Sequence, residues 1–396
     1  MSVGSRGRGP TRGRRSVGLA LVALLLLAGC GDVGNQPTDP RGRDPIDQSV
    51  ARFLDDTLPE GAGGTLVAAR DRELLHCQGF GLADRERRVE ARCDTVYDTM
   101  SMTKQFTAAA ILKLEMMGKL RVTDRTSEHI GPVPRDKRRI TVHHLLTHTS
   151  GLIDALGGDY ERLSRRQMLA GALGSKLRSR PGDDHHYSNL GYSVLAAIIE
   201  KVSGMGYEEF LARRLFAPAG MTQTGYVLPD WRSRQVAVEY DARGRRHGRP
   251  FDHPWADDGP YWNLRGNGGL LSTARDMFRW HVALQGDEVL DHRAKAKMFK
   301  PHVLEQPGGD SHYGYGWVVS EPDGFGRVVW HNGGNRWSYG ELTRLLDPRA
   351  MVFWVTNRYK GRAGRWNFER LGPKLTRGVA DRLRGRRDLA STGLDQ

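Results

Sequence analysis

Ser101 and Lys104 are the residues of this 396-residue chain whose types and spacing most directly indicate chemistry. They stand three positions apart in Ser101-Met102-Thr103-Lys104, and residues at this spacing are neighbours on an α-helix. A serine hydroxyl becomes an effective nucleophile when an adjacent base takes its proton. A lysine that is removed from water can be that base, whereas an arginine holds its proton too tightly. The pair therefore predicts a nucleophile and its base on one turn of helix.

The element expected to position this pair is a helix over Gln105–Leu120. Its apolar stripe recurs at helical spacing and consists of Phe106, Ala110, Ile111, Leu114 and Met117. Ser101 would then lie at the helix N-terminus, where free backbone N–H groups and the helix dipole can stabilise an oxyanion. The pair alone also fits an N-capping serine followed by a solvated lysine. Partner motifs downstream are needed to choose between the two interpretations.

Two such motifs follow later in the chain, Tyr187-Ser188-Asn189 and His331-Asn332-Gly333-Gly334. A tyrosine beside Lys104 can share its proton transfers, and Asn189 can donate to a substrate carbonyl. The glycines of the second motif would let a substrate backbone lie close to the strand expected just before it. Each motif taken alone also fits an ordinary loop or turn.

The order Ser-x-x-Lys, Tyr-x-Asn, His-x-Gly resembles the penicillin-recognising serine hydrolases. The nearest branch contains class C β-lactamases, D-alanyl-D-alanine carboxypeptidases and related esterases. Three longer segments match hallmark stretches of this family, and they are residues 99–109, 140–152 and 266–277. The resemblance extends from about residue 48 to about residue 378.

This resemblance implies that Ser101 is the nucleophile and Lys104 its activating base, while Tyr187 carries protons to the leaving group. Which of Lys104 and Tyr187 is the general base stays open. The implied oxyanion hole consists of the backbone N–H groups of Ser101 and Gly334. The residues implied to contact substrate are Asn189, His331, Asn332, Gly333, Gly334 and Arg336.

Two residues of the third motif depart from the class C β-lactamases. His331 stands where those enzymes carry lysine, and a histidine there is more similar to the carboxypeptidase and esterase members. Asn332 stands where a threonine often binds a substrate carboxylate. Arg336 could supply positive charge nearby, and Trp337 either lines the acyl pocket or is a packed aromatic.

We expect a fold of the α/β (α+β) class, with an antiparallel sheet built from both chain ends, flanking helices and an inserted, mainly helical lobe. The resemblance implies the β-lactamase/transpeptidase-like arrangement, with the site between the two lobes. The predicted hydrolase domain covers 48–383, with an α/β lobe over about 48–98 and 310–383 and a helical lobe over about 99–309. A last helix is expected over Pro373–Leu383 with the proline in its first turn, followed by a disordered tail over 384–396.

The first 29 residues carry five arginines, no acidic residue and an apolar run too short to span a bilayer. The run ends in Leu27-Ala28-Gly29-Cys30, which looks like a bacterial lipobox, so residues 1–29 are predicted to be a lipoprotein signal peptide with lipidation at Cys30. Residues 30–47 would form a flexible tether. The expected location is the cell envelope, membrane-anchored through the N-terminal lipid and facing the periplasm or exterior. An uncleaved anchor or a plain secretory signal are the alternatives.

Cys77 and Cys93 flank a predicted hairpin. A disulfide between them is expected if the protein is exported, and two buried thiols are the alternative. Net charge is +14, which fits an anionic envelope, but no basic stripe with interleaved aromatics indicates nucleic acid. No His-Glu-x-x-His or paired-cysteine pattern indicates a metal, and the absence of Gly-x-Ser-x-Gly excludes an α/β-hydrolase. No cofactor is expected.

The predicted function is therefore a serine hydrolase that forms a Ser101 acyl-enzyme with D-Ala-D-Ala-type peptides, short esters or β-lactams. Peptidoglycan is among the peptide partners that this activity implies. The alternatives are a class C-like β-lactamase and a non-catalytic, penicillin-binding or sensor lipoprotein.

Overall fold

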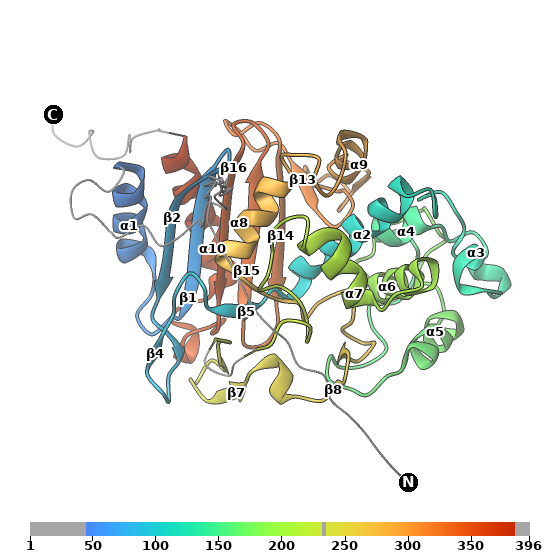
Figure 1. The fold of residues 1–396 in the computed structure, drawn as a ribbon, viewed down its shortest axis with the longest axis horizontal. Helices are drawn as coiled ribbons and strands as arrows, with labels where there is room; N and C mark the ends of the chain where they lie inside the picture. Colours follow the sequence, from blue (N-terminus) through green and yellow to red (C-terminus); the bar gives the residue numbers. More distant parts are fainter. Residues whose placement is uncertain (1–44, 232–234, 385–396) are drawn as a thin grey trace, which may run out of the picture. The chain divides into compact units, whose positions relative to one another are not determined.

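The computed structural model of the protein describes residues 45–231 and 235–384 (Figure 1). The predicted signal peptide, Cys30 and residues 385–396 of the predicted tail lie outside the described residues. Among the described helices, none combines the length and the apolar composition that a membrane crossing requires.

An antiparallel eight-stranded sheet assembled from both ends of the chain forms the centre of the fold, in the order β11-β12-β13-β14-β15-β16-β1-β2. These strands are β1 Gly64–Arg70, β2 Glu73–Phe80, β11 Val303–Leu304, β12 His312–Tyr313, β13 Val318–Ser320, β14 Val328–Gly334, β15 Tyr339–Leu345 and β16 Ala350–Thr356. The first strand pairs with the last, Gly64 opposite Thr356 and Arg70 opposite Ala350. The predicted sheet from both termini is confirmed.

The two faces of the sheet are covered by different helices. Side chains alternate between faces along a strand, so Leu66 and Ala68 of β1 pack with helices α1 (Pro45–Thr57) and α10 (Phe368–Leu383), whereas Val67 and Ala69 face the other core. Because β1 is buried on both faces, its sequence is a continuous apolar run rather than an alternation. Figure 1 shows α1 and α10 on one face and α8 (Ala274–Ala283) on the other.

The α-helices other than α1 and α10 lie between β5 (Val96–Asp98) and β11 in the sequence. They are α2 Lys104–Met116, α3 Thr126–Ile130, α4 Val142–Leu146, α5 Arg165–Gly174, α6 Asn189–Ser203, α7 Tyr207–Leu211 and α9 His292–Met298, with α8 completing the set. Helix α2 is buried without a break from Lys104 to Leu112 and packs against α6. Because a helix that is surrounded by protein has no solvated face, α2 can hold a lysine away from water.

The remaining strands form short two-stranded pairs. They are β3 Leu82–Asp84 with β4 Val89–Glu90, β5 with β10 Leu271–Thr273, β6 Glu239–Tyr240 with β7 Arg246–Gly248, and β8 Trp255–Ala256 with β9 Gly259–Pro260. The β5–β10 pair fixes the chain immediately before the Ser101 segment, since Asp98 lies opposite Leu271.

Four predicted boundaries differ from the structure. Helix α2 ends at Met116, four residues before the predicted Leu120. Helix α10 begins at Phe368, not at Pro373, because the Asn367 side chain accepts a hydrogen bond from the Glu369 N–H and caps the helix earlier. Pro373 therefore lies inside the helix, where it supplies no N–H. Helix α1 begins at Pro45, within the predicted tether. Strand β14 continues through the third motif to Gly334 instead of ending before it.

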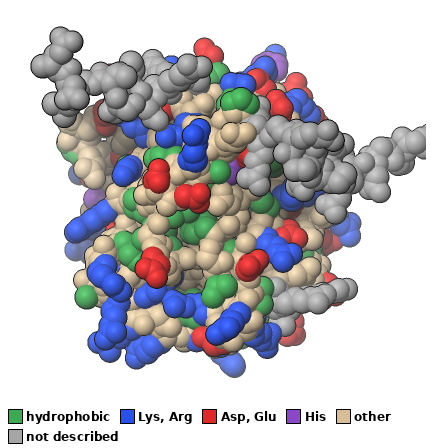
Figure 2. All heavy atoms as spheres, turned by 90° about the vertical axis from the view of Figure 1, so that its left-hand side faces the viewer, with side chains coloured by type: hydrophobic (Ala, Val, Ile, Leu, Met, Phe, Trp, Pro, Cys, Tyr) green, Lys and Arg blue, Asp and Glu red, His purple; other side chains and the backbone are tan. Residues whose placement is uncertain are grey.

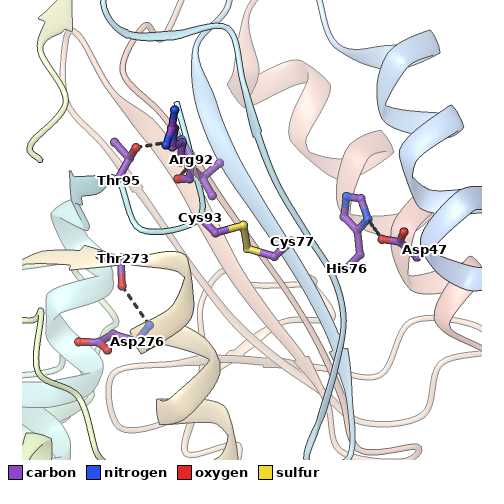
Figure 3. Close-up of a disulfide and its surroundings, with 9 residues drawn as sticks. Asp47, His76, Cys77, Arg92, Cys93, Thr95, Thr273 and Asp276 are labelled. Carbon is purple, nitrogen blue, oxygen red and sulfur yellow. Dashed lines mark hydrogen bonds and ion pairs between the residues drawn. A yellow bond between two sulfur atoms is a disulfide. The ribbon is translucent and has the colours of Figure 1, made fainter. Parts of the chain in front are cut away.

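A disulfide joins Cys77 of β2 to Cys93, with Cα atoms 5.9 Å apart (Figure 3). It ties the edge strand of the sheet to the segment that leads into β5. On the same strand, His76 Nδ1 lies 2.7 Å from Asp47 Oδ1 of α1. Strand β2 is thus held both to the helix on one side and to the approach to the Ser101 segment on the other.

Candidate active site

Ser101 lies in a short 3-10 turn, η1 (Met100–Thr103), which joins β5 to α2. Met100 is buried and has a φ of 50°, a left-handed conformation that a side chain larger than glycine adopts at a cost of about 1–3 kcal/mol. The Asp98 carboxylate accepts a 2.6 Å hydrogen bond from the Met100 N–H. The backbone strain is therefore located one residue before the nucleophile and is held by a neighbouring side chain.

Lys104 is fully buried, and its amine has three neighbours. Nζ lies 3.1 Å from Ser101 Oγ, 2.7 Å from Asn189 Oδ1 and 2.8 Å from the Asn267 carbonyl oxygen. The last two atoms can only accept, so a neutral amine would give them its two N–H groups and keep its lone pair. That lone pair would face Ser101, whose hydroxyl would then donate to the lysine.

The pKa of Lys104 is lowered to about 7 because burial disfavours the charged amine. The carboxylates of Asp154 and Asp159 oppose this effect and keep the pKa from falling further. A lysine with this pKa is uncharged in a large fraction of molecules at neutral pH, as a general base must be.

Asp154 orients the Asn189 side chain. Its Oδ1 accepts hydrogen bonds from the Asn189 backbone N–H at 3.1 Å and from Nδ2 at 2.9 Å. This leaves the amide oxygen turned toward Lys104. Asn189 was predicted to donate to substrate, but in this structure its amide mainly holds the lysine, with one N–H of Nδ2 left over. Asp154 was missed, since no motif or periodicity distinguishes a single aspartate in a loop.

Tyr187 lies beside the nucleophile and the lysine. Its side chain is hydrogen-bonded to Ser101, and Lys104 Nζ lies 4.8 Å from the centre of its ring. The surrounding protein raises the pKa of the phenol, and the hydrogen bond to Ser101 opposes that rise in part. Because its pKa is raised, Tyr187 is a neutral phenol at neutral pH. It also has access to solvent, since 37 % of the residue remains exposed.

His148 holds Tyr187 and its two chain neighbours through three contacts. Its carbonyl oxygen accepts from the His186 N–H at 2.8 Å, its Nδ1 accepts from the Ser188 N–H at 3.0 Å, and its ring centre lies 4.3 Å from that of Tyr187. His148 is buried and has a φ of 58°. The sequence analysis noted this histidine only as part of a hallmark stretch, because its bonds to the residues around Tyr187 exist only in the folded chain.

Strand β14 passes directly beside the Ser101 turn at Gly333. A Cβ atom on Gly333 would lie 2.9 Å from Ser101 N and 2.8 Å from Met100 Cβ, so only glycine permits this approach. The Asn335 N–H bonds the Ser338 carbonyl, and hydrogen-bonded and non-bonded pairs alternate along an antiparallel ladder. Gly334 and its partner Tyr339 are therefore a non-bonded pair, and the Gly334 N–H points away from β15.

His331 is buried and uncharged. Its Nδ1 lies 2.5 Å from the Asn332 carbonyl, so Nδ1 carries the hydrogen, and Nε2 accepts from the Tyr313 hydroxyl at 3.0 Å. Burial lowers the pKa of His331 to about 3, with the nearby Lys104 charge adding to the shift. His331 supplies no positive charge at neutral pH.

Asn332 lies on the opposite face of β14 from Gly333, because side chains alternate along a strand. Its Nδ2 donates to the Tyr339 hydroxyl at 2.8 Å. The expected contact of Asn332 with substrate stays a prediction.

A cavity of about 840 Å³ adjoins Gly334. It is lined by Gly158, Asp159, Tyr160, Glu161, Gly334, Asn335, Arg336, Trp337, Tyr339, Tyr359 and Glu369. Arg336 is exposed. Trp337 both lines the cavity and packs, since its ring stacks on His247 at 3.4 Å between centres.

Two buried carboxyls connect the Ser101 turn with the β14–β15 hairpin. Asp98 holds the Met100 N–H, and Glu239 Oε1 accepts from Asn335 Nδ2 at 3.1 Å and from Ser338 Oγ at 2.5 Å. Burial raises the pKa of both carboxyls, and repulsion from Glu239 adds to the rise at Asp98. Neither residue lies in a recognisable motif, so the sequence analysis missed both.

Comparison with known proteins identifies the family and the fold. Residues 51–371 match the β-lactamase family. The chain is 30% identical over 314 residues to penicillin-binding protein 4* of Bacillus subtilis, covering 74% of this chain and 68% of that protein. It is 23% identical over 301 residues to the protein flp of Staphylococcus aureus, of which it spans only 58%.

Solved structures share the fold. The octameric penicillin-binding protein homologue from Pyrococcus abyssi aligns with a TM-score of 0.71 at 24% identity, over 86% of this chain and 77% of that one. D-amino acid amidase from Ochrobactrum anthropi aligns with a TM-score of 0.71 at 22% identity, over 87% and 100%. With the family match covering most of its length, the chain belongs to the β-lactamase family.

Proposed function

We propose that the protein hydrolyses amide or ester bonds through an acyl-enzyme on Ser101. The observation that carries this proposal is the buried Lys104 amine, 3.1 Å from Ser101 Oγ and bonded otherwise only to two acceptor atoms. When both N–H groups of the neutral amine donate to these acceptors, its lone pair points toward the Ser101 hydroxyl.

In the acylation step, the neutral Lys104 amine takes the Ser101 proton while Oγ attacks the substrate carbonyl carbon. The ammonium ion that forms is stabilised by the Asn189 and Asn267 oxygens, which already face it. The carbonyl oxygen becomes an oxyanion and accepts from the N–H groups of Ser101 and Gly334. Each such donor contributes about 3–4 kcal/mol in serine hydrolases.

Tyr187 then completes the proton transfers. Its hydroxyl is bonded to Ser101, so it can pass a proton from Lys104 to the leaving group and, in the reverse direction, help a water molecule attack the acyl-enzyme. The lowered pKa of Lys104 and the raised pKa of Tyr187 favour the lysine as general base and the tyrosine as a neutral relay.

The proposed substrates are D-Ala-D-Ala-type peptides and short esters, in preference to efficient β-lactam turnover. The neutral His331 and the position of Asn332 leave Arg336 as the basic side chain lining the cavity beside Gly334. This arrangement differs from that of a dedicated class C β-lactamase, which has a lysine at the head of this motif. The penicillin-binding name of the Bacillus subtilis relative supports penicillin as a probe.

Covalent labelling tests the proposal directly. The wild-type protein should form an adduct with a fluorophosphonate and with a fluorescent penicillin, and Ser101→Ala should form neither. The adduct is measured by gel fluorescence and by the mass of the intact protein. Absence of any Ser101-dependent adduct would refute the enzyme proposal.

A hydrolysis panel then separates the alternatives. Nitrocefin, 4-nitrophenyl acetate and a D-Ala-D-Ala peptide are compared at equal enzyme concentration. Turnover of nitrocefin far above the other two would favour a β-lactamase. Labelling by penicillin without turnover of any member would favour a non-catalytic penicillin-binding protein.

A further inference from the structure

The cavity beside Gly334 adjoins the expected oxyanion hole through that residue. Gly334, which is expected to bind the carbonyl oxygen, is part of its wall, whereas Tyr187 is not among its lining residues. The leaving group must remain near Tyr187 to receive its proton. The cavity is therefore positioned for the other substituent of the carbonyl carbon, the acyl group.

The charges around this cavity are opposite to those of the chain as a whole. The sequence contains 60 Lys and Arg against 46 Asp and Glu, yet the cavity is lined by Asp159, Glu161 and Glu369 and by a single base, Arg336. Behind its wall, Glu239 is buried with Oε2 unbonded. Carboxyl groups thus dominate the electrostatic environment of the cavity.

Asp159 is the acidic residue best placed to bind a substrate. It is exposed at the cavity wall, and within the part of the chain that the structure describes its side chain forms no hydrogen bond or ion pair. It lines the same cavity as Gly334, the expected oxyanion donor. Glu369, by contrast, already accepts a hydrogen bond from the Tyr359 hydroxyl.

Aromatic rings form much of the remaining wall, and they are Tyr160, Trp337, Tyr339 and Tyr359. All four rings are stacked. Tyr160 lies on His253 at 4.3 Å and Trp337 on His247 at 3.4 Å between ring centres, and Tyr339 and Tyr359 stack on each other at 5.3 Å. Aromatic faces attract cations and also pack against methylene groups. One occupied face is that of Tyr359, over which Lys360 Nζ lies at 4.3 Å.

We propose that this cavity binds acyl groups that carry a primary ammonium group, with Asp159 as the ion-pair partner of that ammonium. The inference rests on the proposed acyl-enzyme function and specifies its substrate class as aminoacyl esters and amides. The bond changes are those of the proposed reaction, because the ammonium group positions the acyl chain and exchanges no proton.

Matched substrate pairs test this inference. The probes are the 4-nitrophenyl esters of β-alanine and 4-aminobutyrate, compared with those of propionate and butyrate, which lack only the amine. The wild-type enzyme should prefer each amine-bearing ester about fivefold in kcat/KM, the size expected for a partly exposed ion pair. Asp159→Asn should remove the preference, and Glu161→Gln, an equal change of charge in the same cavity, should retain it.

The ratio within a pair isolates recognition from the chemical step. Removing the Asp159 charge also changes the pKa of Lys104, but this affects both members of a pair equally. Arg336→Gln should increase the preference because it removes the base that competes for the cavity. If Asp159→Asn folds poorly, the larger preference for the amine-bearing esters expected in Arg336→Gln still tests the inference.

Two results have different meanings. Equal kcat/KM values for both members of each pair, with hydrolysis still abolished by Ser101→Ala, would overturn the ammonium inference and leave the proposed function intact. Hydrolysis that persists in Ser101→Ala would refute the proposed function itself.

Discussion

Lys104 shows how a buried side chain acquires its chemistry from its neighbours. Burial removes the hydration that stabilises an ammonium ion, whereas the Asn189 and Asn267 oxygens and the carboxylates of Asp154 and Asp159 favour it. The opposing effects leave the pKa at about 7. The amine can therefore lose and regain a proton within one catalytic cycle.

The first prediction concerns pH. Because only the neutral amine can accept the Ser101 proton, kcat/KM for 4-nitrophenyl acetate should rise with pH and level off above about 7. Below that pKa it should fall about tenfold for each pH unit. In the wild type the Asp159 carboxylate raises the pKa of Lys104. Asp159→Asn should therefore lower that pKa and move the rising limb of the profile to lower pH. A limb near the ordinary lysine pKa would contradict Lys104 as the base.

The second prediction concerns His148, which acts through Tyr187. Asparagine tolerates the left-handed backbone and retains an acceptor, but it lacks the ring that packs on Tyr187. His148→Asn should therefore fold and lose about 10- to 100-fold in kcat, because small displacements of a catalytic group are costly. KM should change little. Kinetics and a thermal melt measure both quantities.

A purely structural histidine would give a different result. In that case His148→Asn would lower the melting temperature without changing kcat of the folded fraction. His148→Val serves as the contrasting variant, because a β-branched residue is strained at positive φ, and it should lose stability first.

At the scale of elements, the site depends on how closely β14 approaches the Ser101 turn. Gly333→Ala should push the strand away from Ser101 N and Met100 Cβ, displace the Gly334 N–H and lower kcat at least about tenfold, since one oxyanion donor is worth more than that. The matched control is Gly174→Ala in α5, where an added Cβ meets no atom within 4 Å. Equal kcat values in both variants would contradict this role of β14.

The disulfide gives a prediction about stability. Cys77→Ser combined with Cys93→Ser should lower the free energy of unfolding by about 3 kcal/mol. The bridged cysteines are 16 residues apart in the sequence, and removing a disulfide that closes a loop of about this length costs about that much stability. Urea denaturation measures the change, with the reduced wild type as control. An unchanged denaturation midpoint would show that the hydrogen bonds of β2 to β1 and its contacts with helix α1 hold the strand without the disulfide.

The sequence predicted the elements better than their ends. Ser101, Lys104 and Tyr187 were identified because each lies in a motif, and the structure brings them together. The bond from Asn332 to the Tyr339 hydroxyl could not be predicted, because it depends on the strand register and β14 was expected to end before Asn332. Asp154 and His148 were missed because their roles come from bonds to Asn189 and Ser188, which are 35 and 40 residues away.

The same limit applies to helix ends. Pro373 looked like a first-turn proline, but buried Phe368 and the Asn367 cap extend α10 toward its N-terminus. Tertiary packing outweighed the local preference of proline.

For the whole molecule, we propose attachment to the cell envelope through a lipid on Cys30. Figure 2, viewed from the side of α1 and α10, shows more Lys and Arg than Asp and Glu on the visible face, in keeping with the net charge of +14. Such a surface is favourable near anionic lipids, but the lipid would provide the stable anchor.

The fifth prediction follows from that proposal. The full chain expressed in a bacterium should fractionate with membranes and enter the detergent phase, whereas Cys30→Ala should not carry the lipid mass and should leave the detergent phase. Labelling of Ser101 should be the same in both forms, which serves as the folding control. Retention of Cys30→Ala in the detergent phase would indicate an uncleaved anchor instead.

The pairing of β1 with β16 also sets the order in which this protein can be made. Strand β1 is among the first segments to leave the ribosome and β16 among the last, and β1 is buried on both faces of the finished sheet. Until Ala350–Thr356 arrives, β1 has an unpaired apolar edge, the kind of edge that promotes aggregation. Products of premature termination before Ala350 would keep that edge and become substrates for proteolysis. A C-terminal segment without any catalytic side chain thus decides whether a synthesised chain becomes an enzyme.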